Sequence, residues 1–137
     1  MLRTRFHNML AVLSLALPAL SCAPNDGCEN VEIERVLPPG GDWSAVVFAR
    51  SCGATTGFST QVSVIAEGSV PRASGNVFSA DTDHGSAPSD SVGGPVVRVA
   101  WRGVDTLVVR HHPNARVFLS ENRVHGINVL FVKDSLP

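Results

Sequence analysis

The sequence predicts an all-β, single-domain protein with a sandwich-like antiparallel sheet of about six to eight strands, preceded by a cleaved signal peptide. Three observations predict it. Apolar and β-branched residues alternate with polar ones in short runs, glycine, proline, asparagine and aspartate bound these runs, and no window holds an amphipathic helical stripe longer than two turns. Hairpin arms that follow each other at about ten-residue spacing are typical of antiparallel meanders.

The N-terminus has the composition of a secretory signal. Two arginines precede an apolar run, Met9–Leu20, and small residues follow it. This run is shorter than the roughly 20 residues that a membrane-spanning helix needs, and no transmembrane helix is predicted in the mature chain. We therefore divide the chain into a signal peptide at 1–21, a tether at 22–30 and a β domain at 31–137.

The cleavage site resembles the lipobox of bacterial lipoproteins, in which a cysteine receives the lipid and becomes the new N-terminus. In "ALSC", Ser21 and Cys22 fit that pattern, whereas Ala19 and Leu20 depart from it. The resemblance implies a lipid on Cys22 and a location at the bacterial cell envelope, in the outer membrane if the cell is Gram-negative. Ordinary signal cleavage would instead release a soluble secreted or periplasmic protein.

The chain holds three cysteines, Cys22, Cys28 and Cys52. If Cys22 carries lipid, Cys28 and Cys52 remain as a pair, and an exported pair oxidises to a disulfide. Such a bond closes a loop of about 25 residues and is worth roughly 3.5 kcal/mol in the loop-entropy model. If Cys22 carries no lipid, one of the three thiols is left unpaired. A bond between Cys22 and Cys28 is then the alternative to the Cys28–Cys52 bond. No cysteines have the spacing of a zinc site.

The charge balance excludes some classes of partner. The chain has 11 Lys+Arg and 12 Asp+Glu, and removing the two signal arginines leaves nine against twelve, a net charge of −3. Lys133 is the only lysine, and no basic stripe is visible. Neither nucleic acid nor a polybasic contact with a membrane surface is therefore predicted.

The first four predicted strands precede the aspartate-rich segment. Residues 31–36 form a weak pattern that ends at the turn Pro38–Asp42. Trp43–Arg50 is rich in β-branched and aromatic residues, and Ser59–Ile65 alternates apolar with polar positions. Residues 75–80 form a second weak strand.

The second half begins after a polar segment, Asp81–Pro95, that is predicted to be a surface loop. The first strand after it alternates, so Arg98 and Arg102 lie on the face opposite its apolar residues. Trp43 and Trp101 lie in strand patterns and are predicted to pack in the core, not to form a sugar-stacking platform. The four strands of this half are 95–102, 106–111, 115–120 and 127–132.

The segment "SCGATTGFSTQV", Ser51–Val62, is the strongest candidate for a functional loop. A structural role accounts for its residues, because glycines allow unusual backbone angles and hydroxyls satisfy backbone groups of a loop. Phe58 is predicted to pack in the core where the next strand begins. A binding role on the same loop is the alternative, with Thr55 and Thr56 facing outward. The hydroxyl residues of this possible binding loop are Thr55, Thr56, Ser59 and Thr60.

Two further chemistries are alternatives to binding. A hydrolase would use a hydroxyl of Thr55–Thr60 as nucleophile and a histidine as base, although "GFSTQ" lacks the last glycine of a G-x-S-x-G elbow. A metal-binding protein would use Asp81, Asp83 and His84, whose oxygens and imidazole suit a divalent ion. A solvated acidic turn is the simpler interpretation of these three residues. No catalytic residue, metal ion or cofactor is therefore predicted.

The stretch Leu37–Ile65 resembles the core signature of a family of small, uncharacterised bacterial envelope proteins. The likeness consists of a PDG-type turn, the strand "AVVF" and the segment "CGATTGFST"; Asn76–Gly85 and Val97–Trp101 resemble later parts of the same family. The turn here departs from the usual form, since Pro39–Asp42 contains two glycines and no lysine. The family has no assigned activity, so the resemblance implies an envelope protein and no chemistry.

These observations together predict a small non-enzymatic envelope lipoprotein. Its expected role is that of a binding or accessory module that contacts another envelope or extracellular macromolecule.

Overall fold

The computed structural model describes residues 26–135 of the chain. The predicted signal peptide at 1–21 and the predicted lipidation site, Cys22, lie outside this range. Within it, no helix is long and apolar enough to cross a membrane. The first strand begins at Glu29, so the end of the predicted tether already belongs to the folded domain.

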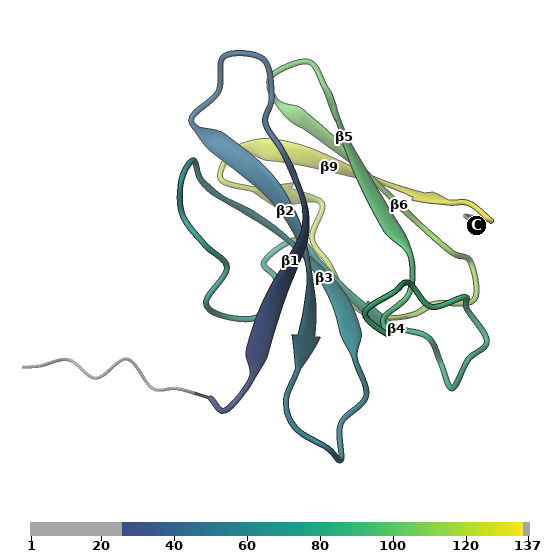
Figure 1. Cartoon of the computed structure of the whole chain (residues 1–137). Coiled ribbons are helices and arrows are strands. Elements are labelled where there is room, and N and C mark those ends of the chain that lie inside the picture. Colours follow the sequence, from purple (N-terminus) through teal and green to yellow (C-terminus); the bar gives the residue numbers. More distant parts are fainter. Residues whose placement is uncertain (1–25, 136–137) are drawn as a thin grey trace, which may run out of the picture.

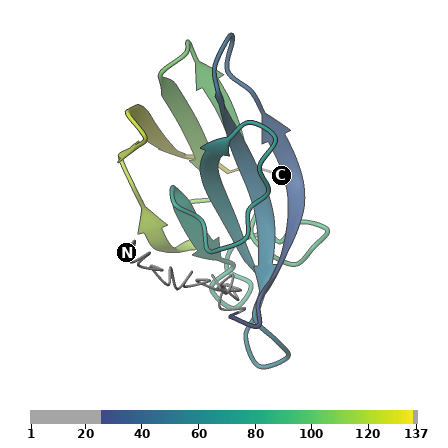
Figure 2. The ribbon, with the colours of Figure 1, turned by 90° about the vertical axis from the view of Figure 1, so that its left-hand side faces the viewer.

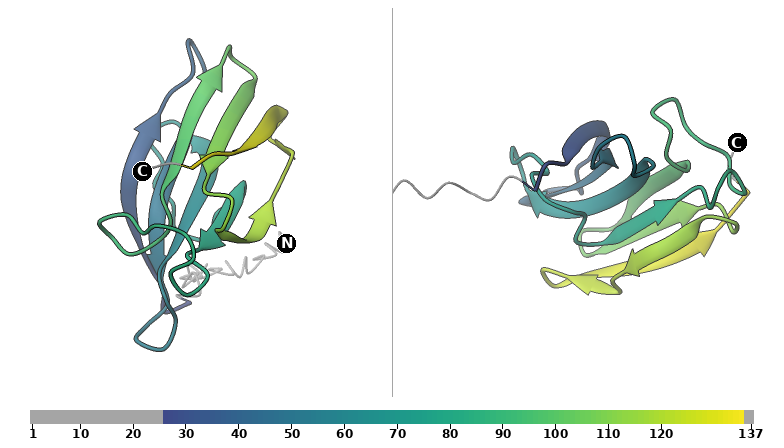
Figure 3. Two further views of the ribbon diagram at one scale, coloured as in Figure 1. Left: turned by 90° about the vertical axis from the view of Figure 1, so that its right-hand side faces the viewer. Right: turned by 90° about the horizontal axis from the view of Figure 1, so that it is seen from below.

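Within residues 26–135, nine strands form two sheets. The sheets lie face to face (Figures 1 and 3), which confirms the prediction of an all-β, sandwich-like domain. The first sheet has the order β1-β2-β3-β4-β7, with β1 (Glu29–Val36), β2 (Trp43–Ser51), β3 (Ser59–Ala66), β4 (Phe78–Asp81) and β7 (Arg116–Ser120). The second sheet has the order β5-β6-β9-β8, with β5 (Val97–Arg102), β6 (Thr106–His111), β8 (Arg123–Val124) and β9 (Ile127–Lys133).

The predicted meander describes β1 to β4 and the β5–β6 hairpin, in which neighbouring strands are antiparallel. It does not describe β9, which pairs with β6 in parallel. After β6 the chain crosses to the first sheet to form β7 and then returns to the second sheet. This crossing lets β9 run in the same direction as β6, because a parallel neighbour needs a long connection.

The core lies between the two inner faces and is built mainly from valines at alternate strand positions. Phe78 of β4 is fully buried at its centre, with its ring centroid 5.9 Å from that of Phe131. Both tryptophans pack against this core as partly buried side chains. Trp101 Nε1 donates a hydrogen bond to the carbonyl of Val36 at 2.9 Å, and Trp43 stacks on His125 with ring centroids 4.3 Å apart.

A third layer covers the outer face of the first sheet. The segment 67–76 crosses over β1, β2 and β3 (Figure 2), and Asn30 Nδ2 of β1 donates to the carbonyls of Pro71 and Ala73, each at 2.9 Å. The Asn76 side chain accepts from the backbone N–H of Val64 and donates to its carbonyl, so it extends the ladder as a strand would. This cover explains why β2 is buried on both faces.

Candidate functional site

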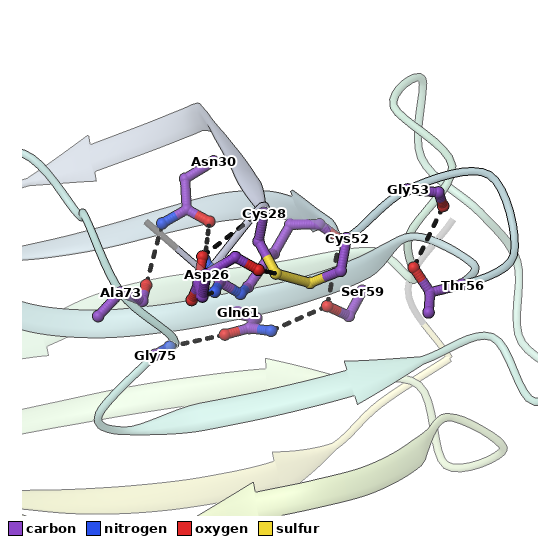
Figure 4. The surroundings of a disulfide bond; sticks show 11 residues. Asp26, Cys28, Asn30, Cys52, Gly53, Thr56, Ser59, Gln61, Ala73 and Gly75 are labelled. Carbon is purple, nitrogen blue, oxygen red and sulfur yellow. Dashed lines mark hydrogen bonds and ion pairs between the residues drawn. A yellow bond between two sulfur atoms is a disulfide. The ribbon is translucent and has the colours of Figure 1, made fainter. Parts of the chain in front are cut away.

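The predicted disulfide between Cys28 and Cys52 is confirmed. Its sulfur atoms are 2.03 Å apart, and it joins the segment just before β1 to the end of β2 (Figure 4). The start of the folded domain is therefore fixed beside the candidate loop that follows Cys52.

A buried cation lies next to this disulfide. The side chain of Arg50 is only 4% exposed, and its guanidinium donates to Asn30 Oδ1 at 2.6 Å and forms an ion pair with Asp26. The Asp26 carboxylate also accepts from the backbone N–H of Cys28 at 3.1 Å. The N–H of Cys28 and the charge of Arg50 hold the pKa of Asp26 below its ordinary value. Arg50 thus has a structural partner and is not open to a ligand.

The loop after Cys52 projects from the end of the first sheet, and Thr55 and Thr56 are exposed as predicted. The backbone N–H and the hydroxyl of Thr56 both donate to the carbonyl of Gly53, each at 3.2 Å. Ser59 Oγ donates to the carbonyl of Arg50 at 3.4 Å, and Thr60 is fully buried. The four predicted hydroxyls therefore do not share one surface.

The prediction that Phe58 packs in the core is wrong, because its side chain is 48% exposed. Phe58 lies one residue before β3, at the end of the sheet, beside the long loop 82–96. A Cβ atom at Gly93 would lie 2.9 Å from the Phe58 ring, so this loop contacts one side of the ring. A Cβ at Gly94 would lie 2.2 Å from Thr60 Oγ1, which shows how closely the loop approaches β3.

The segment Asp81–Gly85 forms a tight turn at the end of β4. Asp83 N donates to Asp81 Oδ1 at 2.9 Å, and Gly85 N donates to Thr82 Oγ1 at 3.3 Å. Asp83 and His84 both adopt left-handed backbone angles, with φ of 48° and 57°. Such angles are uncommon for residues other than glycine, although aspartate and histidine adopt them more often than most.

Arg116 of β7 holds this turn from the neighbouring strand. Its Nε and Nη2 atoms donate to the two carboxylate oxygens of Asp81 at 3.1 and 2.5 Å, and its Nη1 lies 3.7 Å from Asp83 Oδ1. Partial burial raises the pKa of Asp81, but the bonds from Arg116 and from the N–H of Asp83 outweigh it and bring this pKa below the ordinary value. The same pairing raises the pKa of Arg116.

Two of the three candidate metal ligands are therefore engaged with an arginine. Asp81 and Asp83 both face Arg116, and across residues 26–135 no three histidine, cysteine or acidic side chains are grouped closely enough to hold a metal ion. Their arrangement fits an ion-paired turn.

The two candidate segments meet in one open pocket of about 350 Å³, which we call the end pocket. It receives residues from the loop after Cys52, the turn after β4, the long loop and β7. Its lining residues are Gly57, Phe58, Asp81, Thr82, His84, Gly93 and Arg116. An aromatic face, an imidazole and a guanidinium can together hold a small polar or aromatic group of a larger partner.

The end pocket does not bring the hydroxyl loop and a histidine into a catalytic arrangement. Within the described residues, no hydrogen bond joins a hydroxyl of Thr55–Thr60 to a histidine. His84 lines the pocket, whereas His111 is buried, with its ring centroid 5.0 Å from that of Phe78, and burial lowers its pKa. A nucleophile and base within bonding reach are the usual sign of a hydrolase.

Sequence reasoning missed Arg116, Thr82 and Gly93 as members of the pocket. Arg116 stands directly opposite Asp81 in the β4–β7 pair, a register that joins residues 35 positions apart. Only the order of strands in the sheet reveals this pairing.

The chain has no match among the family models, the curated proteins or the solved structures with which it was compared.

Proposed function

We propose that this chain is a small, non-enzymatic binding module of the bacterial cell envelope, anchored by a lipid on Cys22. It acts by holding another envelope or extracellular macromolecule at the end pocket. The observation that carries this proposal is the convergence of the two candidate loops on one open pocket that presents the Phe58 ring.

The pocket has the features of a preorganised recognition site. The disulfide holds one of its loops at the base, the Arg116–Asp81 pair holds the turn, and Gly93 packs against the Phe58 ring. A half-exposed aromatic ring in such a frame contributes contact area at little entropic cost on binding. A binding role without catalysis accounts for these features, because the residues named here either fix the shape of the pocket or present a surface to a partner.

The disulfide also orients the domain relative to the proposed anchor. Cys22 precedes Cys28 by six residues, and six extended residues reach about 20 Å. The loop that begins at Cys52 would therefore stay within about that distance of the lipid. A partner at the end pocket is then expected to lie close to the membrane that carries the anchor.

Site-specific photo-crosslinking in intact cells tests the proposal. A photoreactive phenylalanine at position 58 should form a defined adduct, and the same group at Val104, which is 62% exposed in the β5–β6 turn, is the matched control. We expect the adduct from position 58 alone. Equal adducts from both positions, or none from position 58, would argue against the end pocket as the binding surface.

A further inference from the structure

The outer face of the second sheet gathers arginines from three of its four strands. Arg98 and Arg102 come from β5, Arg110 from β6 and Arg123 from β8, and all four are exposed. We call this surface the arginine face; the left view of Figure 3 shows the ribbon of the second sheet from this side. The expectation that the chain has no basic stripe is therefore wrong, because strand pairing brings together residues that are separated in the sequence.

The register orders this face into three rows that cross the strands. The rows are Arg98–Arg110–Val132, then Ala100–Val108–Leu130, then Arg102–Thr106–Asn128–Arg123. The middle row is apolar, with Leu130 43% exposed. Val108 is only 6% exposed although it faces outward, as expected where long neighbouring side chains lie over it. An apolar strip thus lies between two rows that carry positive charge.

The charges on this face are mostly uncompensated. Arg110 forms an ion pair with Asp134 at 3.2 Å, while Arg98 reaches only the carbonyl of Val97 at 3.4 Å. Arg102 and Arg123 make no ion pair or side-chain hydrogen bond with a described residue. Arg98 and Arg110 are directly opposed across β5 and β6, and like charges in that position destabilise a sheet. The charges of this pair therefore do not stabilise the fold.

We propose that the arginine face is a docking surface for an acidic patch on a partner protein. Protein interfaces combine an apolar centre with a polar rim and are enriched in arginine and depleted in lysine, as this face is. Planar guanidinium groups bind carboxylates through two parallel hydrogen bonds, which suits aspartate and glutamate side chains. The exposed Leu130 in the middle row supplies the apolar centre.

The charge of the rest of the molecule favours a protein over a phosphate polymer or an anionic bilayer. Without the four arginines of the face, the mature chain has five basic and twelve acidic residues, a net charge of −7. An extended polyanion or a charged bilayer would meet this repulsive field as well as the face. A compact acidic patch can meet the face alone.

Binding of defined probes to the purified full chain tests the proposal. The probes are a fluorescent hexaglutamate peptide, which is short enough to meet the face alone, a 20-base-pair DNA duplex and vesicles that contain phosphatidylglycerol. The variant R98E/R110E reverses two charges of the face. Arg98→Glu alone and Arg72→Glu, on the exposed segment that covers the other sheet, change the net charge equally, so these two single variants are the matched comparison. We expect the peptide to bind, roughly tenfold or more weakly in the double variant because two charge pairs are lost, and unchanged in Arg72→Glu.

Four results would overturn the proposal. Arg72→Glu could weaken peptide binding as much as the double variant, the peptide could fail to bind, or the duplex or vesicles could bind more tightly than the peptide through the same arginines. A loss of self-association in the double variant, measured by light scattering, would identify the partner as a second copy and would also contradict it.

Thermal unfolding gives an independent readout. Arg98→Gln keeps much of the side-chain stem and removes one of the two opposed charges. Because a surface kept for binding retains a destabilising pair, the melting temperature should rise by about 1 to 4 °C. An equal or lower melting temperature would show that the pair is neutral in the fold and would remove this support for the proposal.

Discussion

Arg116 and Asp81 stand directly opposite each other on β7 and β4, and the guanidinium of one binds both carboxylate oxygens of the other. This contact fixes the turn that forms one wall of the end pocket. It joins the edge strand of the first sheet to the site, so the pocket depends on a strand that enters the fold late in the sequence.

The first prediction concerns the pH dependence of this pair. The pKa of Asp81 is lower in the folded chain than in the unfolded one, so its stabilisation is present above the unfolded value, about 3.9, and is lost as the pH falls through the folded value. Asp81→Asn should therefore cost about 0.5–1 kcal/mol at pH 7 and little at pH 2. Urea unfolding at both pH values measures this. Arg116→Gln should likewise reduce the loss of unfolding free energy between pH 7 and pH 2. If this loss is unchanged in either variant, the pairing is contradicted.

The second prediction concerns the disulfide. Replacing Cys28 and Cys52 with alanine removes a link across 24 residues, which should lower the free energy of unfolding by roughly 3.5 kcal/mol. Urea denaturation of the oxidised chain and of the variant gives the difference. If reduction of the disulfide in the native chain leaves the urea midpoint of unfolding unchanged, the bond does not constrain the unfolded chain.

The third prediction concerns Phe58. Since its ring is about half exposed, Phe58→Ala should cost about 1 kcal/mol, well below the 3 kcal/mol or more expected for a core ring. Thr55→Ala, on the exposed part of the same loop, should stay within about 0.5 kcal/mol. Phe58→Ala should also abolish the crosslinked adduct formed from a photoreactive group placed at Gly57. A loss of 3 kcal/mol would show that the ring is buried in solution.

The fourth prediction separates two glycines that border the end pocket or its loop. A Cβ at Gly94 would meet Thr60 at 2.2 Å, whereas a Cβ at Gly57 would have no atom within 4 Å. Gly94→Ala should therefore destabilise the domain by about 1–3 kcal/mol as the loop is pushed away, and Gly57→Ala should be nearly neutral. Thermal melting of both variants measures the contrast. Equal melting temperatures would mean that the long loop does not pack on β3.

The fifth prediction concerns the anchor. Replacing Cys22 with serine should release the chain from membranes or leave its signal uncleaved, because serine cannot accept the thioether-linked lipid. Fractionation of cells and mass spectrometry of the N-terminus report the two outcomes. Unchanged membrane association of the variant would contradict lipidation at Cys22.

Much of the fold could be predicted from local pattern. The alternation in β3 and β5 identifies these strands, and a run of β-branched and aromatic residues identifies β2. The pairing of Cys28 with Cys52 followed from counting cysteines. The strands can be recognised from residues that are close in the sequence, and the disulfide from the number of cysteines.

What could not be predicted depends on which strands are neighbours. Phe58 continues the alternation of β3, but it lies just before that strand and its side chain is half exposed, so the pattern alone gives the wrong burial. Arg116 meets Asp81, and Arg98 meets Arg110, only through register between strands. The parallel pairing of β6 with β9 likewise cannot be recognised from the residues of either strand.

The placement of β9 has a consequence for how the domain acquires its structure. β9 is an interior strand of the second sheet, between β6 and β8, and it carries Ile127 and Val129 of the core. A chain that is still emerging from a ribosome before residue 127 leaves β6 with an unpaired edge and the interior incomplete. Folding of the second sheet is therefore postponed until residues 127–133 have emerged.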